Sequence, residues 1–284
     1  MQGPALAPAQ RAVVARRRLA GEFTAEALLE QLRAIAGFDA DNDARRQRYG
    51  GFAIAAFVAV VICLFLAIPF GRAALVVALA AFVAAIVLGV LWKRLAAADI
   101  SDNVRDVALP FLAIVKQDLA PGAMVSVDLD LAPATDAAKR TGVSPPYARG
   151  SYTKVVDTSY RDAWFSGSAR LADASVLRWH VVDEVIESKR SKRSRSNKWK
   201  TKTHEVKRSA IAVSVALPTK TYAVAAGAAK PNLKLALAAD DKRTTVKLVR
   251  KIKAKDLDPI DPRALIDTVA EAYRRVTPAR SATP

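Results

Sequence analysis

The sequence predicts a membrane protein of the α+β class, with a two-helix transmembrane hairpin followed by an antiparallel β-rich cytoplasmic domain and a C-terminal amphipathic helix. Three observations support this: two adjacent apolar stretches early in the chain, alternating polar and apolar residues later, and a helical pattern near the end. The 284 residues divide into an N-terminal cytoplasmic arm 1–51, the hairpin 52–92, a helical connector 93–122, the β domain 123–255 and a C-terminal helix and tail 256–284.

The N-terminal arm contains one helical pattern. Apolar residues recur every three or four positions, Thr24 provides an N-cap and Gly37 provides a stop. We expect a short amphipathic helix between these two residues, lying on the membrane surface or against the later domain. Its apolar positions are Leu28, Leu29, Leu32 and Ile35. Residues 1–20 are expected to be disordered or partly helical.

Two apolar stretches, 52–70 and 73–92, predict the transmembrane hairpin. Neither contains a charged residue, nor any Ser, Thr, Asn, Gln or His. As helices they would be roughly 28 and 30 Å long, which matches the hydrocarbon core of a bilayer. Core helices of soluble proteins usually keep a polar stripe, and these stretches have none. Pro69 and Gly71 allow the chain to reverse, and the Arg72 side chain can reach the interface.

The charges that flank the hairpin predict its orientation. Arg45, Arg46 and Arg48 precede the first helix, Lys93 and Arg94 follow the second, and the connecting loop carries only Arg72. Positively charged residues favour the cytoplasmic side of a membrane. We therefore expect a multi-pass protein of the cell (inner) membrane with both termini in the cytoplasm.

The hairpin alone is not expected to form a pore or carrier, because transport needs polar or ionisable groups at membrane depth. Ala81, Ala85 and Gly89 lie at four-residue spacing, which lets helices approach closely. Three interpretations stay open: these small residues form a homo-oligomer contact between copies of the chain, the two helices of one hairpin pack on each other, or the spacing only reflects the abundance of alanine in this stretch.

The connector contains a helical pattern over 103–119, which Pro110 is expected to kink or restart. From Met124 the apolar period changes to two, which predicts a half-buried strand over 124–131. A stretch with Pro and Gly over 142–150 predicts a loop. Further strands are expected at 163–171, 175–186, 201–217, 222–226, 233–238 and 244–252. Closely spaced strands without intervening helices indicate an antiparallel sandwich or a partly closed barrel.

The last helix is expected to begin at Asp261, an N-cap, and Pro262, a first-turn proline. Its apolar residues share one face, which we expect to cover the sheet. They are Leu265, Ile266, Val269, Ala272, Tyr273 and Val276.

Positive charge is concentrated in two segments. Of the net charge of +17, residues 189–208 contribute +9 and residues 242–255 contribute +7. The first segment joins two strand candidates, so we expect it to form the tip and upper arms of a long β-hairpin. Crowded like charges cost free energy, and a bound polyanion would offset that cost. The anion-binding residues predicted here are Lys189, Arg190, Lys192, Arg193, Arg195, Lys198, Trp199 and Lys200.

Four interpretations of this basic hairpin are open. It is a solvated tip that deters edge pairing, or it docks on the anionic headgroups of the cytoplasmic leaflet. It could instead bind nucleic acid, although such surfaces usually add several stacking aromatics and only Trp199 interrupts the run. The fourth possibility is an acidic protein partner. Trp199 also suits a lipid interface.

No residue set has convincing catalytic or metal-binding spacing. His180 and His204 are the only histidines, and the single Cys63 lies in an apolar stretch. Asp128 and Asp130 fit the solvated face of a strand. We therefore expect a non-enzymatic protein without cofactor or metal. Its expected function is that of a membrane-anchored binding or scaffold protein, whose basic cytoplasmic β domain contacts anionic lipid or an acidic partner. The alternative is a membrane-tethered nucleic-acid-binding protein.

Overall fold

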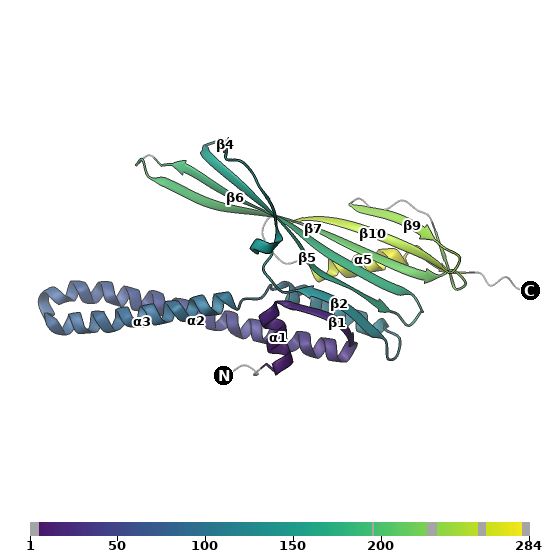
Figure 1. Ribbon diagram of the computed structural model, residues 1–284, viewed down its shortest axis with the longest axis horizontal. Helices are drawn as coiled ribbons and strands as arrows, with labels where there is room; N and C mark the ends of the chain where they lie inside the picture. Colours follow the sequence, from purple (N-terminus) through teal and green to yellow (C-terminus); the bar gives the residue numbers. More distant parts are fainter. Residues whose placement is uncertain (1–5, 195, 226–231, 255–259, 280–284) are drawn as a thin grey trace, which may run out of the picture. The chain divides into compact units, whose positions relative to one another are not determined.

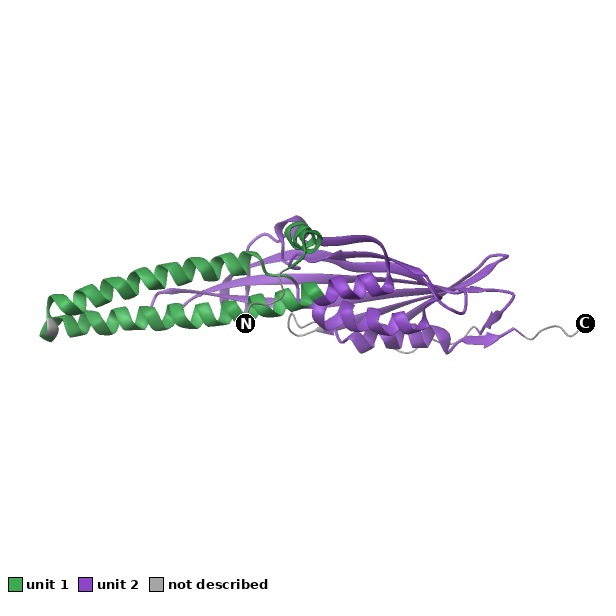
Figure 2. Cartoon of the chain, turned by 90° about the horizontal axis from the view of Figure 1, so that it is seen from below, with its two compact units in different colours: residues 1–16, 34–100 green, residues 17–33, 101–284 purple. Residues whose placement is uncertain are grey.

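The computed structural model describes residues 6–194, 196–225, 232–254 and 260–279 (Figure 1). It contains two long apolar helices in the N-terminal half, followed by a large antiparallel sheet and a C-terminal helix. The chain forms two compact units (Figure 2). Unit 1 comprises residues 1–16 and 34–100, and unit 2 comprises residues 17–33 and 101–284.

Unit 1 is helical. It contains α1 (Pro8–Arg16), most of α2 (Ala25–Phe70) and α3 (Arg72–Ala97). Gly71 joins the two long helices with φ +61°, a conformation that glycine adopts without steric cost, and its N–H donates to the Ala67 carbonyl at 2.9 Å. Each long helix is long and apolar enough to cross a membrane, with a mean hydropathy of 3.0 over its most apolar 18 residues.

The polar ends of α2 and α3 are joined by specific contacts. The Asn42 side-chain amide donates to the Leu95 carbonyl at 3.2 Å, and Arg46 forms a 2.7 Å ion pair with Asp99. The Arg46 guanidinium also lies 5.4 Å from the ring centroid of Trp92. These contacts fix the register of the two helices at one end.

The short helix expected between Thr24 and Gly37 is not a separate element. It is the beginning of α2, which runs without a break into the first apolar stretch. The prediction that Gly37 ends the helix was wrong. A glycine inside a helix costs only about 1 kcal/mol, and the next proline in the sequence is Pro69.

Unit 2 is built on a nine-stranded antiparallel sheet. Its main path follows the order β1-β2-β5-β6-β7-β10-β9, and β3 and β4 pair with β5 beside this path. The strands are β1 (Arg18–Thr24), β2 (Met124–Asp130), β3 (Arg140–Val143), β4 (Tyr147–Arg149), β5 (Tyr152–Arg170), β6 (Val176–Arg193), β7 (Trp199–Pro218), β9 (Leu233–Ala239) and β10 (Arg243–Ala254). A second, two-stranded sheet pairs β8 (Tyr222–Val224) with β11 (Val276–Pro278).

Helices cover one face of this sheet, which we call the inner face. The connector forms a π-helical turn, η1 (Val104–Ala108), followed by α4 (Leu109–Val115) and a 3-10 turn, η2 (Lys116–Asp118). The backbone stays helical from η1 into α4, and the α-helix restarts at Leu109 with Pro110, which has no N–H to donate, in its first turn, in agreement with the expected restart. The last helix, α5 (Pro262–Tyr273), packs against β7 and β10, and its N-cap Asp261 accepts from the Arg263 N–H at 2.9 Å.

Aromatic side chains form the centre of the inner-face core. Phe111, Phe165 and Trp179 contact one another, with ring centroids 5.9 Å apart for Phe111 and Phe165, 5.6 Å for Phe165 and Trp179, and 5.4 Å for Phe111 and Trp179. Trp164 stacks on Phe165 at 5.4 Å. All four side chains are buried. Aromatic pairs in such geometries contribute roughly 0.5–1.5 kcal/mol beyond the burial of their area. This cluster fixes α4 on the sheet.

The β domain in the structure differs in several details from the one predicted from the sequence. β1 was not predicted and pairs with β2 from Arg18↔Asp130 to Thr24↔Met124. The stretch 142–150, expected as a loop, contains the end of β3 and all of β4. The expected strands are present, but β5, β6 and β7 are longer than predicted, with 19, 18 and 20 residues. Val276, assigned to the last helix, begins β11 instead, and Ala226 lies outside the described residues.

A glycine in β5 tests the packing of the core. A Cβ added at Gly167 would overlap the Trp179 ring and lie 2.5 Å from the backbone carbonyl of Ser126. Backbone cannot move aside without breaking the β2–β5 ladder, so Gly167→Ala should lower the free energy of unfolding by at least about 2 kcal/mol. Gly142→Ala is the matched control, because no atom lies within 4 Å of its Cβ position. Thermal unfolding of the purified full chain measures both, and equal stability of the two variants would contradict this packing.

Candidate anion-binding surface

The long strands β5, β6 and β7 extend beyond the helix-covered core as an arm (Figure 1). We define the basic arm as residues 152–161, 184–194 and 196–208. It begins at a β-bulge, where the β5–β6 register shifts between Asp162 and Phe165. The β6–β7 register has no such shift and continues from Val176↔Ala216 to Arg193↔Trp199. Because side chains alternate along a strand, this register assigns every residue of the β6–β7 hairpin to one of two faces.

The outer face of the basic arm carries most of its positive charge. Arg190 lies opposite Lys202, Lys192 lies opposite Lys200, and His204 lies opposite Ser188. Directly opposed like charges destabilise a strand pair. This face also carries two acids. Glu184 lies between Arg161 and Arg208 in the register, and Asp157 pairs with Ser188 across β5 and β6. Hydrogen bonds from Ser188 and Tyr147 lower the pKa of Asp157, which therefore stays ionised but is already engaged.

The inner face of the arm is mixed in charge. Lys189 forms a 3.2 Å ion pair with Glu187, which itself lies opposite Glu205. At the tip, the Arg193 guanidinium lies 5.6 Å from the ring centroid of Trp199, whose side chain is exposed. The anion-binding residues predicted from the sequence are therefore divided between the two faces of the arm. Arg190, Lys192 and Lys200 lie on the outer face, and Lys189, Arg193 and Trp199 lie on the inner face.

The tip completes the placement of the predicted residues. Lys198 lies in the connecting turn, where its carbonyl accepts from the Ser194 N–H at 2.9 Å, and Asn197 adopts φ +60°. Arg195 lies outside the described residues. The predicted set omitted Lys202 and His204, which the pairing places on the outer face. Counting residues back from the turn along both strands would show that they share this face, but that count needs the length of the turn, which the sequence does not give.

The base of the arm is a buried group of charges on the inner face, which we call the base cluster. Lys139 Nζ lies 2.8 Å from Asp162 Oδ1 and 3.1 Å from Asp130. On the neighbouring strands, Lys207 Nζ lies 2.9 Å from Asp183 Oδ2, and Ser209 Oγ donates to Asp183 Oδ1 at 2.6 Å. Asp162 and Asp183 are direct cross-strand partners.

The base cluster is costly because its charges are removed from water. The Asp162 and Asp183 side chains are only 2% and 0% exposed. Burial raises the pKa of Asp162 to about 6, although Lys139 opposes the shift, and the nearby Asp130 and Asp183 raise it further. Removing one partner of such a buried pair leaves an uncompensated charge, which costs roughly 3–5 kcal/mol. The cluster therefore ties β5, β6 and β7 together where the arm leaves the core.

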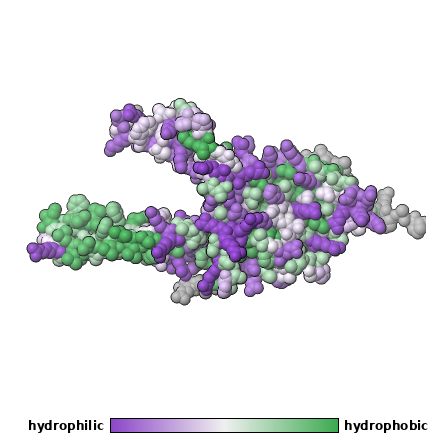
Figure 3. Space-filling model, in the orientation of Figure 1, coloured by the Kyte–Doolittle hydropathy of each residue, from purple (hydrophilic) through white to green (hydrophobic). Residues whose placement is uncertain are grey.

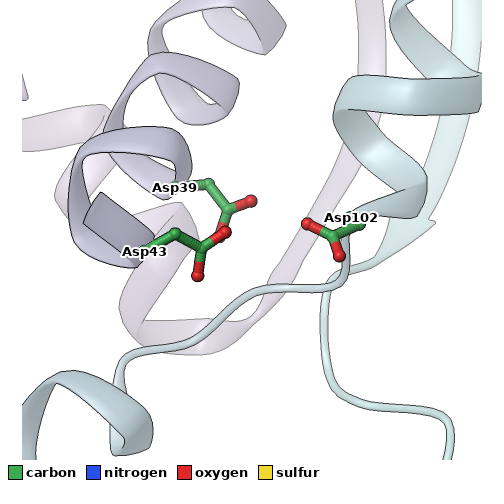
Figure 4. A group of neighbouring side chains, drawn as sticks. All are labelled: Asp39, Asp43 and Asp102. Atoms are coloured by element: carbon green, nitrogen blue, oxygen red, sulfur yellow. The ribbon is translucent and has the colours of Figure 1, made fainter. Parts of the chain in front are cut away.

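Among the described residues, the other acidic and imidazole groups form no comparable site. His180 and His204 are both exposed, and eight positions of β6 separate His180 from Ser188, the partner of His204. Asp128 is engaged by Arg18 at 2.7 Å. Figure 4 draws Asp39 and Asp43, which lie one turn apart on α2 in unit 1, and Asp102, which pairs with Arg105 at 2.8 Å in unit 2. We assign no metal site to these acids.

The raised pKa of Asp162 predicts how stability depends on pH. A raised native pKa means that the folded chain holds a proton that the unfolded chain has lost between about pH 4 and 6, so stability falls as pH rises through this window. Asp162→Asn removes this dependence. As pH rises from 4 to 8, the free energy of unfolding of the unmodified chain should fall by up to about 3 kcal/mol relative to that of the variant. Fluorescence-detected thermal unfolding can follow the buried Trp164 and Trp179. A parallel pH dependence of both proteins would contradict the assignment.

No protein-family model matches the chain, and no curated protein or solved structure matches it either. A function must therefore be inferred from the chemistry of the chain's own surfaces. Two surfaces carry that chemistry: the exposed apolar side chains of α2 and α3, and the outer face of the basic arm.

Proposed function

We propose that this chain is a non-enzymatic, membrane-anchored binding protein. In this proposal the apolar stretches 52–70 of α2 and 73–92 of α3 form a transmembrane hairpin. The outer face of the basic arm binds anionic lipid headgroups at the cytoplasmic leaflet. The observation that carries the proposal is the combination of a fully apolar, exposed helical hairpin with a strongly basic sheet face in one chain.

The exposure of the apolar helices supports the anchor. Phe65 is 72% exposed, Ile68 87% and Leu79 64%, and none of the most apolar window of α2 is buried (Figure 3). Exposed apolar surface costs roughly 25 cal/mol per Å² in water, and one bilayer would cover the whole hairpin. The backbone groups of both helices are satisfied within the helices, as a lipid environment requires.

The connectivity supports a firmly held domain. The hairpin is inserted into unit 2, because residues 17–33 and residues from 101 onward both belong to it. β1, before the hairpin, pairs directly with β2, after it. Two covalent connections therefore join the anchor to the β domain. They keep the basic arm within reach of the same bilayer, which raises the local concentration of lipid.

Charge density supports the choice of an anionic surface. Each Lys or Arg near such a leaflet contributes roughly 1 kcal/mol, and four outer-face cations lie in two adjacent pairs. Lys192 also lies 5.5 Å from the ring centroid of Tyr152, so its extended side chain is held near the tip. Two tyrosines lie beside this outer face, but Tyr147 donates to Asp157 and the Lys192 ammonium lies over the Tyr152 ring, whereas a nucleic acid normally meets several open stacking platforms.

The proposed topology has a direct test. Both termini should be cytoplasmic, and Gly71 and Arg72 should face the opposite side, because positive flanks outnumber the single arginine of the turn. In intact cells, tags at either terminus should resist an externally added protease, whereas a cleavage sequence inserted after Gly71 should be cut. A terminal tag that is digested in intact cells would exclude this orientation.

Lipid binding by the outer face can be tested with charge-matched variants of the full chain. The outer variant carries Arg190→Gln, Lys200→Gln and Lys202→Gln, and the inner control carries Lys154→Gln, Lys189→Gln and Arg193→Gln. Both lose three positive charges, the outer variant from β6 and β7 and the inner control from β5 and β6. With the protein in phosphatidylcholine nanodiscs, the outer variant should bind vesicles containing phosphatidylserine roughly 100-fold more weakly, and the control less than tenfold.

The same assay decides against the proposal in three cases. These are equal losses in both variants, equal binding to neutral and anionic vesicles, and tighter binding of single-stranded DNA than of anionic vesicles at the same salt concentration. The last result would favour the nucleic-acid function. Binding to lipid should also weaken steeply as ionic strength rises, because exposed charges are screened over about 8 Å at physiological salt.

A further inference from the structure

A second basic feature lies on the outer face of the main sheet, on the far side of the base cluster from the arm tip. It is a shallow, open trough of about 480 Å³. The residues that give it its chemistry are Ser166, Ser168, Arg178, His180, Ser214 and Lys247. It crosses four strands, from β5 to β10, and shares no residue with the basic arm.

The register of the sheet builds this trough as a single row. Ser168 pairs with Arg178, Arg178 pairs with Ser214, and Ser214 pairs with Lys247. Neighbouring strands lie about 4.8 Å apart, so the backbones of Arg178 and Lys247 stand roughly 10 Å apart across Ser214. The two long side chains rise on either side of a small hydroxyl. That spacing leaves room for one tetrahedral anion between them.

Small side chains form the floor of the trough. In the next row, Ser166 pairs with His180, and His180 pairs with Ala212. On the opposite face, the space beside Gly167 is filled by Trp179, which is buried in the core. The aromatic core therefore supports a floor of hydroxyl and methyl groups. The basic side chains form its walls.

The positive charge of the trough is not neutralised within the described chain. Arg178, His180 and Lys247 are exposed and form no ion pair with another described residue. The acid nearest in the register is Asp128, opposite Ser166, and its carboxylate is held by Arg18. The exposed Glu22 lies in the same row as Arg178 but three strands away, beyond Ser126 and Ser168. Two permanent cations flanking hydroxyl donors, with no acid in the lining of the trough, match an anion with two negative charges.

We propose that this trough is a binding site for a phosphate monoester. The Arg178 guanidinium and the Lys247 ammonium contact the phosphate oxygens, the Ser168 and Ser214 hydroxyls donate to them, and His180 borders the organic group. A monoester carries close to two charges at neutral pH and has three terminal oxygens, which suits two cations and two hydroxyls. The volume also accommodates a small organic moiety. This site is additional to the proposed lipid-binding arm and does not depend on it.

The test uses the full chain in phosphatidylcholine nanodiscs, titrated calorimetrically with inorganic phosphate and with glycerol 3-phosphate. The variant Arg178→Gln/Lys247→Gln should weaken binding of both probes at least tenfold. Lys251→Gln/Lys253→Gln is the matched control, because it removes two positive charges from β10 outside the trough and should change binding less than threefold. Ser214→Leu fills the floor and should abolish binding, whereas Ser214→Ala should weaken it only modestly.

Separate arms identify the source of the phosphate. Binding of glycerol 3-phosphate assigns a soluble ligand, and Arg178-dependent binding of phosphatidic acid vesicles alone assigns a lipid headgroup. The proposal is overturned if both double variants lose binding equally, or if chloride at matched ionic strength reproduces the titration. Unchanged circular dichroism of each variant confirms that loss of binding is not loss of the fold. If Arg178→Gln/Lys247→Gln unfolds, retained binding by the folded Ser214→Leu variant overturns the proposal.

Discussion

The uninterrupted pairing of β6 with β7 is the constraint on which the rest of unit 2 depends. Its register runs unchanged from Val176↔Ala216 in the core to Arg193↔Trp199 at the tip. One set of alternate residues supplies the core, including Leu177 and Val213, and then the base cluster. The other set supplies the trough and the basic outer face. A slip of one residue would exchange these faces completely, so core packing and surface charge are set by the same register.

The base cluster marks the change between the two halves of that hairpin. Toward the core, helices cover the inner face, and apolar side chains stabilise it. Toward the tip, no described helix covers the inner face. There the strands are held by the hydrogen bonds between them and by β3 and β4, which pair with β5. The ion pairs of Lys207 with Asp183 and of Lys139 with Asp162 lie at this boundary. Their buried charges penalise any alternative register, because a shifted strand would leave them unpaired.

The local order of apolar, polar and charged residues was enough to predict the two apolar helices, the alternating strands and the basic hairpin. Features that depend on distant partners were not predictable. β1 carries no strong alternation and becomes a strand only because β2 lies beside it. Lys189 and Arg190 are neighbours on one strand and therefore point to opposite faces. Which residues of β7 share a face with each of them depends on the register, and so on a turn whose length the sequence does not show. Asp162 and Lys139 meet only because of the bulge in β5.

Residue-by-residue accessibility along β6 tests the central claim most directly. Single cysteines from 186 to 193, introduced into a full chain with Cys63→Ala, can carry spin labels, since Cys63 is the only cysteine. Adding anionic bilayers should reduce collisions with a water-soluble relaxation agent at positions 190 and 192 and leave positions 189, 191 and 193 nearly unchanged. Ser188 is already buried within the chain and serves as a protected reference. Protection without a period of two, or protection of the odd-numbered face, would contradict the account.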